Sequence, residues 1–145
     1  MQTSSFYKIA KLGITGNIYK VLRNMYSNST AYIKLSGHLS NKFKILKGTE
    51  QGHPLSPELF KIFLSDLSPL LEIKECPLLS NKSISHLLWA DDLIMLSLSP
   101  EACQYQLDQL AKFCNEWGLE VNDLKTQLMI FGAKEKYANF KWKNS

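Results

Sequence analysis

The chain has 145 residues and a formal net charge of +4, and 45% of its residues are hydrophobic, 11% aromatic and 21% charged. A chain of this length suits a single domain. The composition excludes a chain that is disordered throughout, because disorder needs low hydrophobicity and high net charge. The mildly basic balance permits a nucleic-acid partner without identifying one, since phosphate binding depends on clustered charge.

The cysteines argue against two kinds of stabilised fold. They are three in number and have no CxxC spacing: Cys76, Cys103 and Cys114. This pattern disfavours a disulfide framework or a zinc site and favours a reducing compartment.

No run of about 18 apolar residues occurs, and residues 1–9 lack the apolar core of a signal peptide. We therefore expect a soluble intracellular protein without a membrane partner, in either nucleus or cytoplasm, and find no sign of a specific protein partner.

The first third of the chain predicts helices followed by a hairpin. Residues 6–25 carry apolar side chains at helical spacing, but glycines interrupt them, so we expect two short helices joined near Gly13. Residues 30–35 alternate between apolar and polar, and an extended pattern resumes at residues 43–46 after a Ser-Gly pair. This arrangement predicts a β-hairpin.

The middle of the chain predicts a helix and a second hairpin. The turn-rich residues 48–57 lead into a helix with Ser56 as N-cap and Pro57 in its first turn. Its apolar residues form one broad face as far as Leu71, which predicts a single helix. Residues 85–98 then form an extended hairpin with an acidic pair at its turn.

The last third predicts a long helix and a short strand. Pro100 opens the helix and Gly118 ends it. Its apolar stripe comprises Cys103, Leu107, Leu110, Cys114 and Trp117. Residues 128–131 predict a final strand. Antiparallel strands packed on helices make an α+β domain.

The acidic pair Asp91 and Asp92 is the most informative feature, because apolar strand sequence flanks it on both sides. Adjacent carboxylates repel each other and need a compensating charge, and their hard oxygen atoms suit Mg²⁺. Ala90 is small enough to let a nucleotide or a nucleic-acid end come close. The alternative is a merely polar turn, since aspartate favours turns. The pair alone leaves both interpretations open.

Three motifs in order connect this turn to a known family. Residues 48–60 read GTEQGHPLSPELF and resemble a G-x-x-Q-G-x-P-x-S-P motif that enters a helix. Residues 88–92 read LWADD and resemble an aromatic-Ala-Asp-Asp turn. Residues 121–126 read VNDLKT and, with Met129, resemble an N-x-x-K-T motif. Together the motifs resemble the reverse transcriptase family of non-LTR (LINE-type) retrotransposons over about residues 6–131.

The resemblance implies a fold and an activity. The fold would be α+β, a polymerase palm-like antiparallel sheet packed on helices, with residues 1–145 as one partial reverse transcriptase domain. The activity would be RNA-directed DNA polymerisation by two-metal nucleotidyl transfer. The implied cofactor is Mg²⁺, and the implied partners in the intact parent protein are an RNA template, a DNA primer and dNTP.

The resemblance also assigns roles to individual residues. It makes Asp91 and Asp92 catalytic, metal-binding residues. Lys125 would lie near the leaving pyrophosphate, where a cation neutralises charge or donates a proton; its alternative is a solvated surface lysine. Gln51 and Gly52 would line the nucleotide and template pocket, where glycine permits close backbone approach. Ala90 completes the implied substrate-binding set.

Several positions depart from the family pattern. Trp89 replaces the usual Tyr or Phe, and Glu50 stands where a basic residue is frequent. His53 favours a turn role over catalysis. Tyr26 and Tyr32 are candidates for stacking on bases, although packing against the first hairpin is the simpler interpretation.

The resemblance places a first catalytic carboxylate on a strand just before Phe6, but residues 1–5 hold no acid, and no thumb follows the last motif. We therefore expect an incomplete metal site and a fragment that is inactive alone. The alternatives are a catalytically dead retroelement remnant, a nucleic-acid-binding scaffold, or a small α-β domain unrelated to polymerases.

Overall fold

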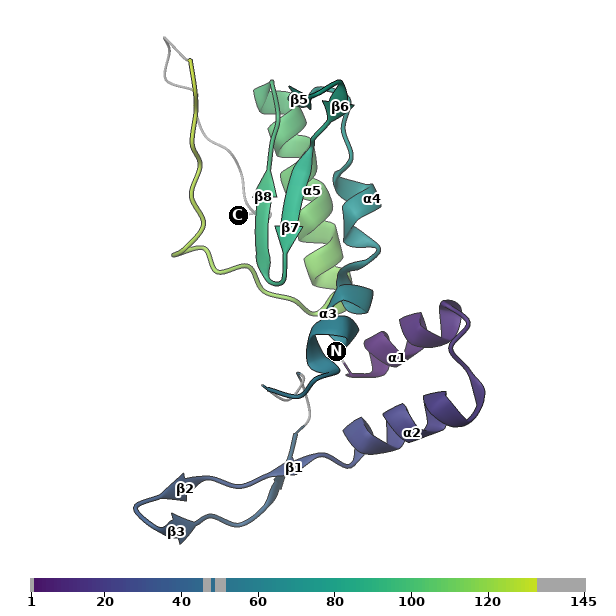
Figure 1. The fold of residues 1–145 in the computed structure, drawn as a ribbon. Helices are drawn as coiled ribbons and strands as arrows, with labels where there is room; N and C mark the ends of the chain where they lie inside the picture. The colour runs from purple at the N-terminus through teal and green to yellow at the C-terminus, as the bar shows by residue number, and fades with distance from the viewer. Residues whose placement is uncertain (1, 46–47, 49–51, 133–145) are drawn as a thin grey trace. The chain divides into compact units, whose positions relative to one another are not determined.

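The structure is a computed structural model that describes residues 2–45, 48 and 52–132. The chain divides into two compact units, one ending at Leu64 and the other beginning at Ser65 (Figure 1). Among the described residues, no helix has the length and apolar character needed to cross a membrane.

Three helices build the first unit: α1 (Gln2–Lys11), α2 (Gly16–Ser27) and α3 (Ser56–Leu64). The predicted break near Gly13 is confirmed, because this glycine adopts a φ of 84° between α1 and α2. The core that joins the helices consists of Phe6, Ile9, Tyr26 and Leu59.

A buried amine reinforces this core. Lys8 is only 3% exposed, and its Nζ donates a hydrogen bond to the carbonyl oxygen of Phe63 at 2.6 Å. The same Nζ lies 5.3 Å from the centre of the Phe63 ring, within cation–π range. Because Phe63 lies in the last turn of α3, the lysine places positive charge where the helix dipole favours it. Lys8 therefore fastens α1 to the end of α3.

The predicted first hairpin is confirmed as a bulged ribbon. Its four short strands are β1 (Thr30–Ala31), β2 (Lys34–Leu35), β3 (His38–Leu39) and β4 (Phe43–Lys44). β1 pairs with β4, and β2 pairs with β3, both antiparallel. Between the two ladders, two residues on one side face three on the other, which makes a one-residue β-bulge. The turn residues Ser36 and Gly37 both have positive φ, as a type I′ turn requires.

The second unit combines two helices with two hairpins. Its elements are α4 (Leu67–Leu71), β5 (Leu78–Leu79), β6 (Lys82–Ser83), β7 (His86–Trp89), β8 (Asp92–Met95) and α5 (Pro100–Trp117). The predicted ends of α5 are confirmed, because Ser99 accepts a hydrogen bond from the Ala102 amide and Gly118 adopts a left-handed φ of 66°. The mixed α+β class is therefore confirmed.

Gln106 fixes the base of the β7–β8 hairpin. It is fully buried, and its Nε2 donates to the carbonyl oxygens of Leu71 and Ser85, each at 2.9 Å. These bonds join α5 to the end of α4 and to the residue before β7. The stripe predicted for α5 is thus rotated, since its most buried residues are Gln106, Leu110, Phe113 and Cys114.

The prediction of one helix extending to Leu71 is wrong. α3 ends at Leu64, and α4 begins at Leu67. Pro69 explains the break, because proline has no amide to donate to the carbonyl four residues earlier and its ring clashes there. Proline is tolerated only in a first turn, where α4 places it.

The predicted strand at residues 128–131 is also wrong, since this segment is irregular. An isolated strand gains no ladder hydrogen bonds, and among the described residues no segment pairs with it. The described strands form four separate two-stranded pairs. A continuous palm-like sheet stays a prediction.

Candidate active site

The acidic pair occupies the tight turn of the β7–β8 hairpin. The ladder runs in one register from the His86–Met95 pair to the Trp89–Asp92 pair, which leaves Ala90 and Asp91 as the two turn residues. Ala90 has a φ of 51°. This left-handed conformation costs an L-residue with a side chain about 1–2 kcal/mol. The turn residues Ser36, Ser80 and Asn81 of the other hairpins also have positive φ, so this conformation reflects the geometry of a tight hairpin turn.

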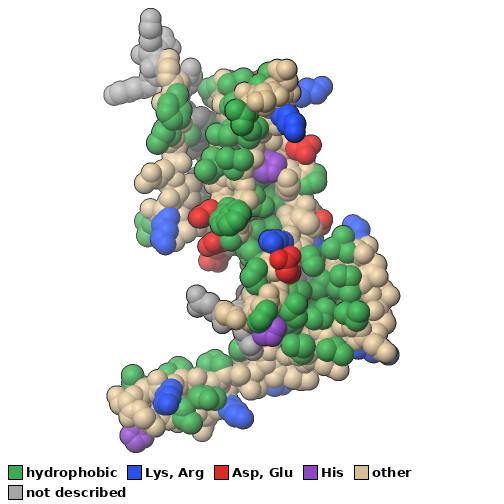
Figure 2. All heavy atoms as spheres, in the orientation of Figure 1, with side chains coloured by type: hydrophobic (Ala, Val, Ile, Leu, Met, Phe, Trp, Pro, Cys, Tyr) green, Lys and Arg blue, Asp and Glu red, His purple; other side chains and the backbone are tan. Residues whose placement is uncertain are grey.

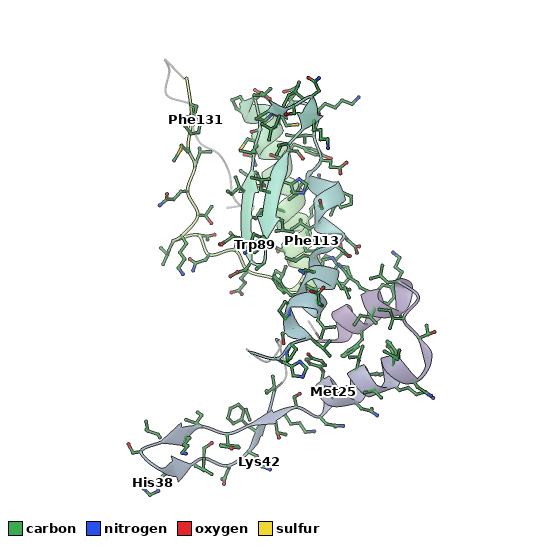
Figure 3. The ribbon with its side chains drawn as sticks, in the orientation of Figure 1. Met25, His38, Lys42, Trp89, Phe113 and Phe131 are labelled. Carbon is green, nitrogen blue, oxygen red and sulfur yellow. The ribbon has the colours of Figure 1, made fainter. Side chains whose placement is uncertain are left out.

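The two faces of this hairpin differ in exposure. Leu87, Trp89 and Ile94 lie on the open face, and Trp89 is 82% exposed at the turn end (Figure 3). Leu88 and Met95 lie on the opposite face and are half-buried. One face therefore anchors the hairpin within its unit, while Asp91 and Asp92 both project into solvent.

The carboxylates suit a hard divalent cation but supply only part of its shell. Within the described ranges, neither Asp91 nor Asp92 forms an ion pair. The same ranges contain no group of three or more His, Cys, Asp or Glu side chains that could hold a metal. Mg²⁺ prefers six oxygen ligands and keeps several waters. The pair therefore fits a magnesium site that takes its other ligands from elsewhere.

The Q-G-x-P loop belongs to the first unit. Gln51 lies outside the described residues. Gly52 is exposed with a φ of 84°, and a Cβ there would meet nothing within 4 Å, so conformation rather than space favours glycine. His53 Nδ1 accepts a hydrogen bond from the Leu55 amide at 3.2 Å and lies 3.3 Å from the hydroxyl of Tyr26. These contacts tie the loop to α2.

Lys125 belongs to the second unit and lies in a tight turn after α5. The carbonyl oxygen of Asn122 accepts from the amides of Lys125 and Thr126 at 3.1 and 3.0 Å, and from the Thr126 hydroxyl at 2.9 Å. The turn presents Lys125 to solvent. In the part of the chain that the structure describes, its side chain forms no ion pair with either aspartate.

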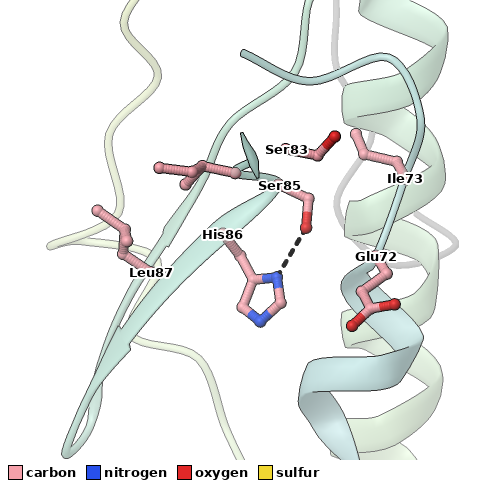
Figure 4. A pocket seen from close by; sticks show the side chains of 7 residues that line it. Glu72, Ile73, Ser83, Ser85, His86 and Leu87 are labelled. Atoms are coloured by element: carbon pink, nitrogen blue, oxygen red, sulfur yellow. Dashed lines mark hydrogen bonds between the residues drawn. The ribbon is translucent and has the colours of Figure 1, made fainter. Parts of the chain in front are cut away.

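A pocket of about 460 Å³ opens at the other end of β7, and the motifs gave no sign of it (Figure 4). His86 lines it and is held on both sides, with Nδ1 at 3.0 Å from the Ser85 hydroxyl and Nε2 at 2.7 Å from that of Ser68. None of the predicted site residues lines this pocket. Its serines and histidine stabilise the hairpin base, and the acidic turn remains the candidate site.

Comparison with known proteins agrees with the three motifs. The model of the family reverse transcriptase (RNA-dependent DNA polymerase) matches residues 3–142. The chain is 29% identical over 114 residues to the retrovirus-related Pol polyprotein from type-1 retrotransposable element R2 of Nasonia vitripennis, covering 77% of this chain and 11% of that protein. It is 25% identical over 137 residues to the RNA-directed DNA polymerase from mobile element jockey of Drosophila melanogaster, covering 88% and 14%.

A second R2 Pol polyprotein, from Popillia japonica, is 29% identical over 123 residues, covering 81% of this chain and 17% of that protein. The chain thus spans between 11% and 17% of the length of these three relatives. The predicted resemblance to reverse transcriptases of non-LTR retrotransposons is confirmed, and the chain belongs to the reverse transcriptase (RNA-dependent DNA polymerase) family.

Proposed function

We propose that residues 1–145 form part of one reverse transcriptase domain that carries out RNA-directed DNA polymerisation in a longer protein. The observation that carries this proposal is the two-residue turn that presents both carboxylates to solvent on a hairpin anchored at its base. The substrates are dNTP and a DNA primer paired with an RNA template. The match to the family over residues 3–142 supports this substrate class.

Asp91 and Asp92 are the proposed metal-binding residues. When bound, Mg²⁺ supplies the charge that stabilises the attacking and leaving oxygens of nucleotidyl transfer. Asp91 lies in the turn after β7, and Asp92 follows it as the first residue of β8, so two oxygen-donor side chains are adjacent. Ala90 leaves room for the primer end beside them, since its side chain is one methyl group.

Lys125 and the Q-G-x-P loop are the proposed partners of the nucleotide. An exposed lysine at a fixed turn suits the negative charge that develops on a departing pyrophosphate. Gly52 lets backbone approach the nucleotide closely, and Gln51 is the proposed side-chain contact beside it. Two aspartates provide too few ligands for two metal ions, so we expect the chain alone to be inactive.

Primer extension on an RNA template with Mg²⁺ tests the proposal. The chain is compared with a version joined at its N-terminus to a family-like strand that supplies a further carboxylate, and each is paired with an Asp91→Asn variant. Extension by the joined form that is lost with Asp91→Asn supports the proposal. No extension by either form, with circular dichroism showing both folded, favours a catalytically dead remnant.

A further inference from the structure

The first third of the chain contains a concentration of positive charge that the aspartate turn does not use. Residues 1–49 hold eight of the 17 Lys and Arg and none of the 13 Asp and Glu. The second unit contains Asp91 and Asp92 and most of the other acids. This asymmetry points to a polyanion that contacts the first unit.

Within the first unit, the bulged β1–β4 hairpin carries three of these cations on one short ribbon. Lys34, Lys42 and Lys44 are all exposed, and His38 stands at the tip (Figure 3). Figure 2 shows blue side chains and no red ones on this ribbon. We infer that residues 30–45, hereafter the basic ribbon, bind the phosphate backbone of a single-stranded nucleic acid; the inference rests on the proposed function for the choice of partner.

The spacing of the lysines suits a chain of phosphates. Lys44 lies at the base of the ribbon, opposite Thr30, and Lys42 lies two residues closer to the tip. Lys34 pairs with Leu39 and is therefore five residues from Lys44 along the ribbon. At about 3.3 Å per residue, these positions cover roughly 17 Å of ribbon. Three cations along a line of this length can contact successive phosphates of one strand, and such contacts supply sequence-independent affinity.

Two exposed aromatic rings belong to the ribbon, and Phe43 lies on the face opposite to its strand neighbour Lys44. Tyr32 is 54% exposed in the bulge and Phe43 is 48% exposed on β4. Rings on a basic groove or ribbon stack on bases and favour single strands over duplexes, because every unpaired base offers a flat face. The two tyrosines therefore differ. Tyr26 is buried in the core and packs there, whereas Tyr32 is exposed and could stack on a base.

Two other partners fit the ribbon less well. A protein partner is disfavoured because lysine is depleted at protein–protein interfaces. A second copy of this chain is disfavoured because lysines on an exposed edge oppose strand-to-strand pairing, and two acid-free ribbons repel each other. Charge complementarity therefore selects the nucleic acid.

The test is fluorescence anisotropy with a labelled single-stranded RNA of mixed sequence over a series of KCl concentrations. The variant carries Lys34→Gln, Lys42→Gln and Lys44→Gln. Its matched control carries Lys74→Gln, Lys82→Gln and Lys112→Gln, three exposed lysines of the second unit. Each phosphate contact contributes about 0.7 to the salt dependence of binding. We expect the ribbon variant to lose a slope of about 2 and to bind about tenfold to hundredfold more weakly, with little change in the control.

Three results would overturn the inference: no RNA binding by the unmodified chain, equal losses in the two variants, or a ribbon variant with altered self-association and unaltered RNA affinity. Ultraviolet crosslinking adds a second readout, since we expect crosslinks at Tyr32, and crosslinks confined to the second unit contradict the inference. The two proposals can fail separately. If RNA binding depends on the ribbon but the chain joined to the extra N-terminal strand does not extend a primer, this inference holds and the proposed polymerase activity is rejected.

Discussion

The β7–β8 hairpin and the basic ribbon are both antiparallel hairpins, but they differ in register, in exposure and in their turn residues. The β7–β8 hairpin keeps one register over four pairs, rests one face on its unit and turns through Ala90 and Asp91. The basic ribbon changes register at a bulge, exposes nearly every side chain and turns through Ser36 and Gly37. A fixed hairpin suits groups that must be positioned, such as metal-binding carboxylates. An open ribbon suits a surface that follows a flexible strand.

The largest contrast is expected between an aromatic ring of the ribbon and one of α5, the helix that holds the base of the β7–β8 hairpin. Phe113 is 1% exposed and packs near Trp117, so Phe113→Ala leaves a cavity and should cost about 3–5 kcal/mol in the free energy of unfolding. Phe43→Ala on the ribbon should cost less than about 1 kcal/mol. Urea unfolding followed by circular dichroism measures both, and similar losses would mean that the ribbon is as tightly packed as the second unit.

Loosening the base of the β7–β8 hairpin should have an intermediate effect. Gln106→Met removes two buried hydrogen bonds and leaves the carbonyls of Leu71 and Ser85 without that donor, at an expected cost of about 1–3 kcal/mol. The amide of Leu96, which donates to Ser85 at 2.8 Å, should exchange its hydrogen faster. The control is Gln104→Met, whose Nε2 bonds to Asp108 at an exposed site. If Leu96 is equally protected in both variants, Gln106 does not anchor the hairpin.

Exchanging alanine and glycine at the hairpin turns should change the free energy of unfolding least, and the change should have opposite signs in the two hairpins. Ala90→Gly relieves a left-handed alanine and should stabilise the chain by about 0.5–1 kcal/mol. Gly37→Ala introduces the same strain into the ribbon and should destabilise it by about 1 kcal/mol. Thermal unfolding of both variants tests the pair. A destabilised Ala90→Gly would show that the alanine methyl group makes contacts worth more than the strain.

The positions of the β1–β4 hairpin, the β7–β8 hairpin and α5 could be predicted because local signals define them, such as the Ser-Gly turn and the Gly118 stop. The signal for the break between α3 and α4 was present in Pro69, but the apolar face on both sides concealed it. The β5–β6 hairpin was missed because its turn uses Ser80 and Asn81, both with positive φ, rather than a glycine. The usual sequence signature of such a turn is Asn-Gly or Asp-Gly, and this turn has neither.

The acidic turn was visible in the sequence because two adjacent carboxylates stand out between two apolar strand segments. Gln106 was overlooked since a polar residue beside an apolar stripe is ordinarily assigned to the surface. Its spacing of four and seven residues from Leu110 and Phe113 places it on the same helical face, and that spacing was the available signal. The strand predicted at residues 128–131 failed because extended propensity does not supply a pairing partner.

The bond between Lys8 and Phe63 has a consequence for biosynthesis. These residues are 55 positions apart, so the first unit cannot close its core until α3 has been synthesised and has left the ribosome. Until then α1 and α2 expose Phe6, Ile9 and Tyr26, and the nascent chain is open to misassembly and to chaperones. The joint between Leu71 and Gln106 spans only 35 positions, so the second unit waits for a shorter stretch of translation before it can fold.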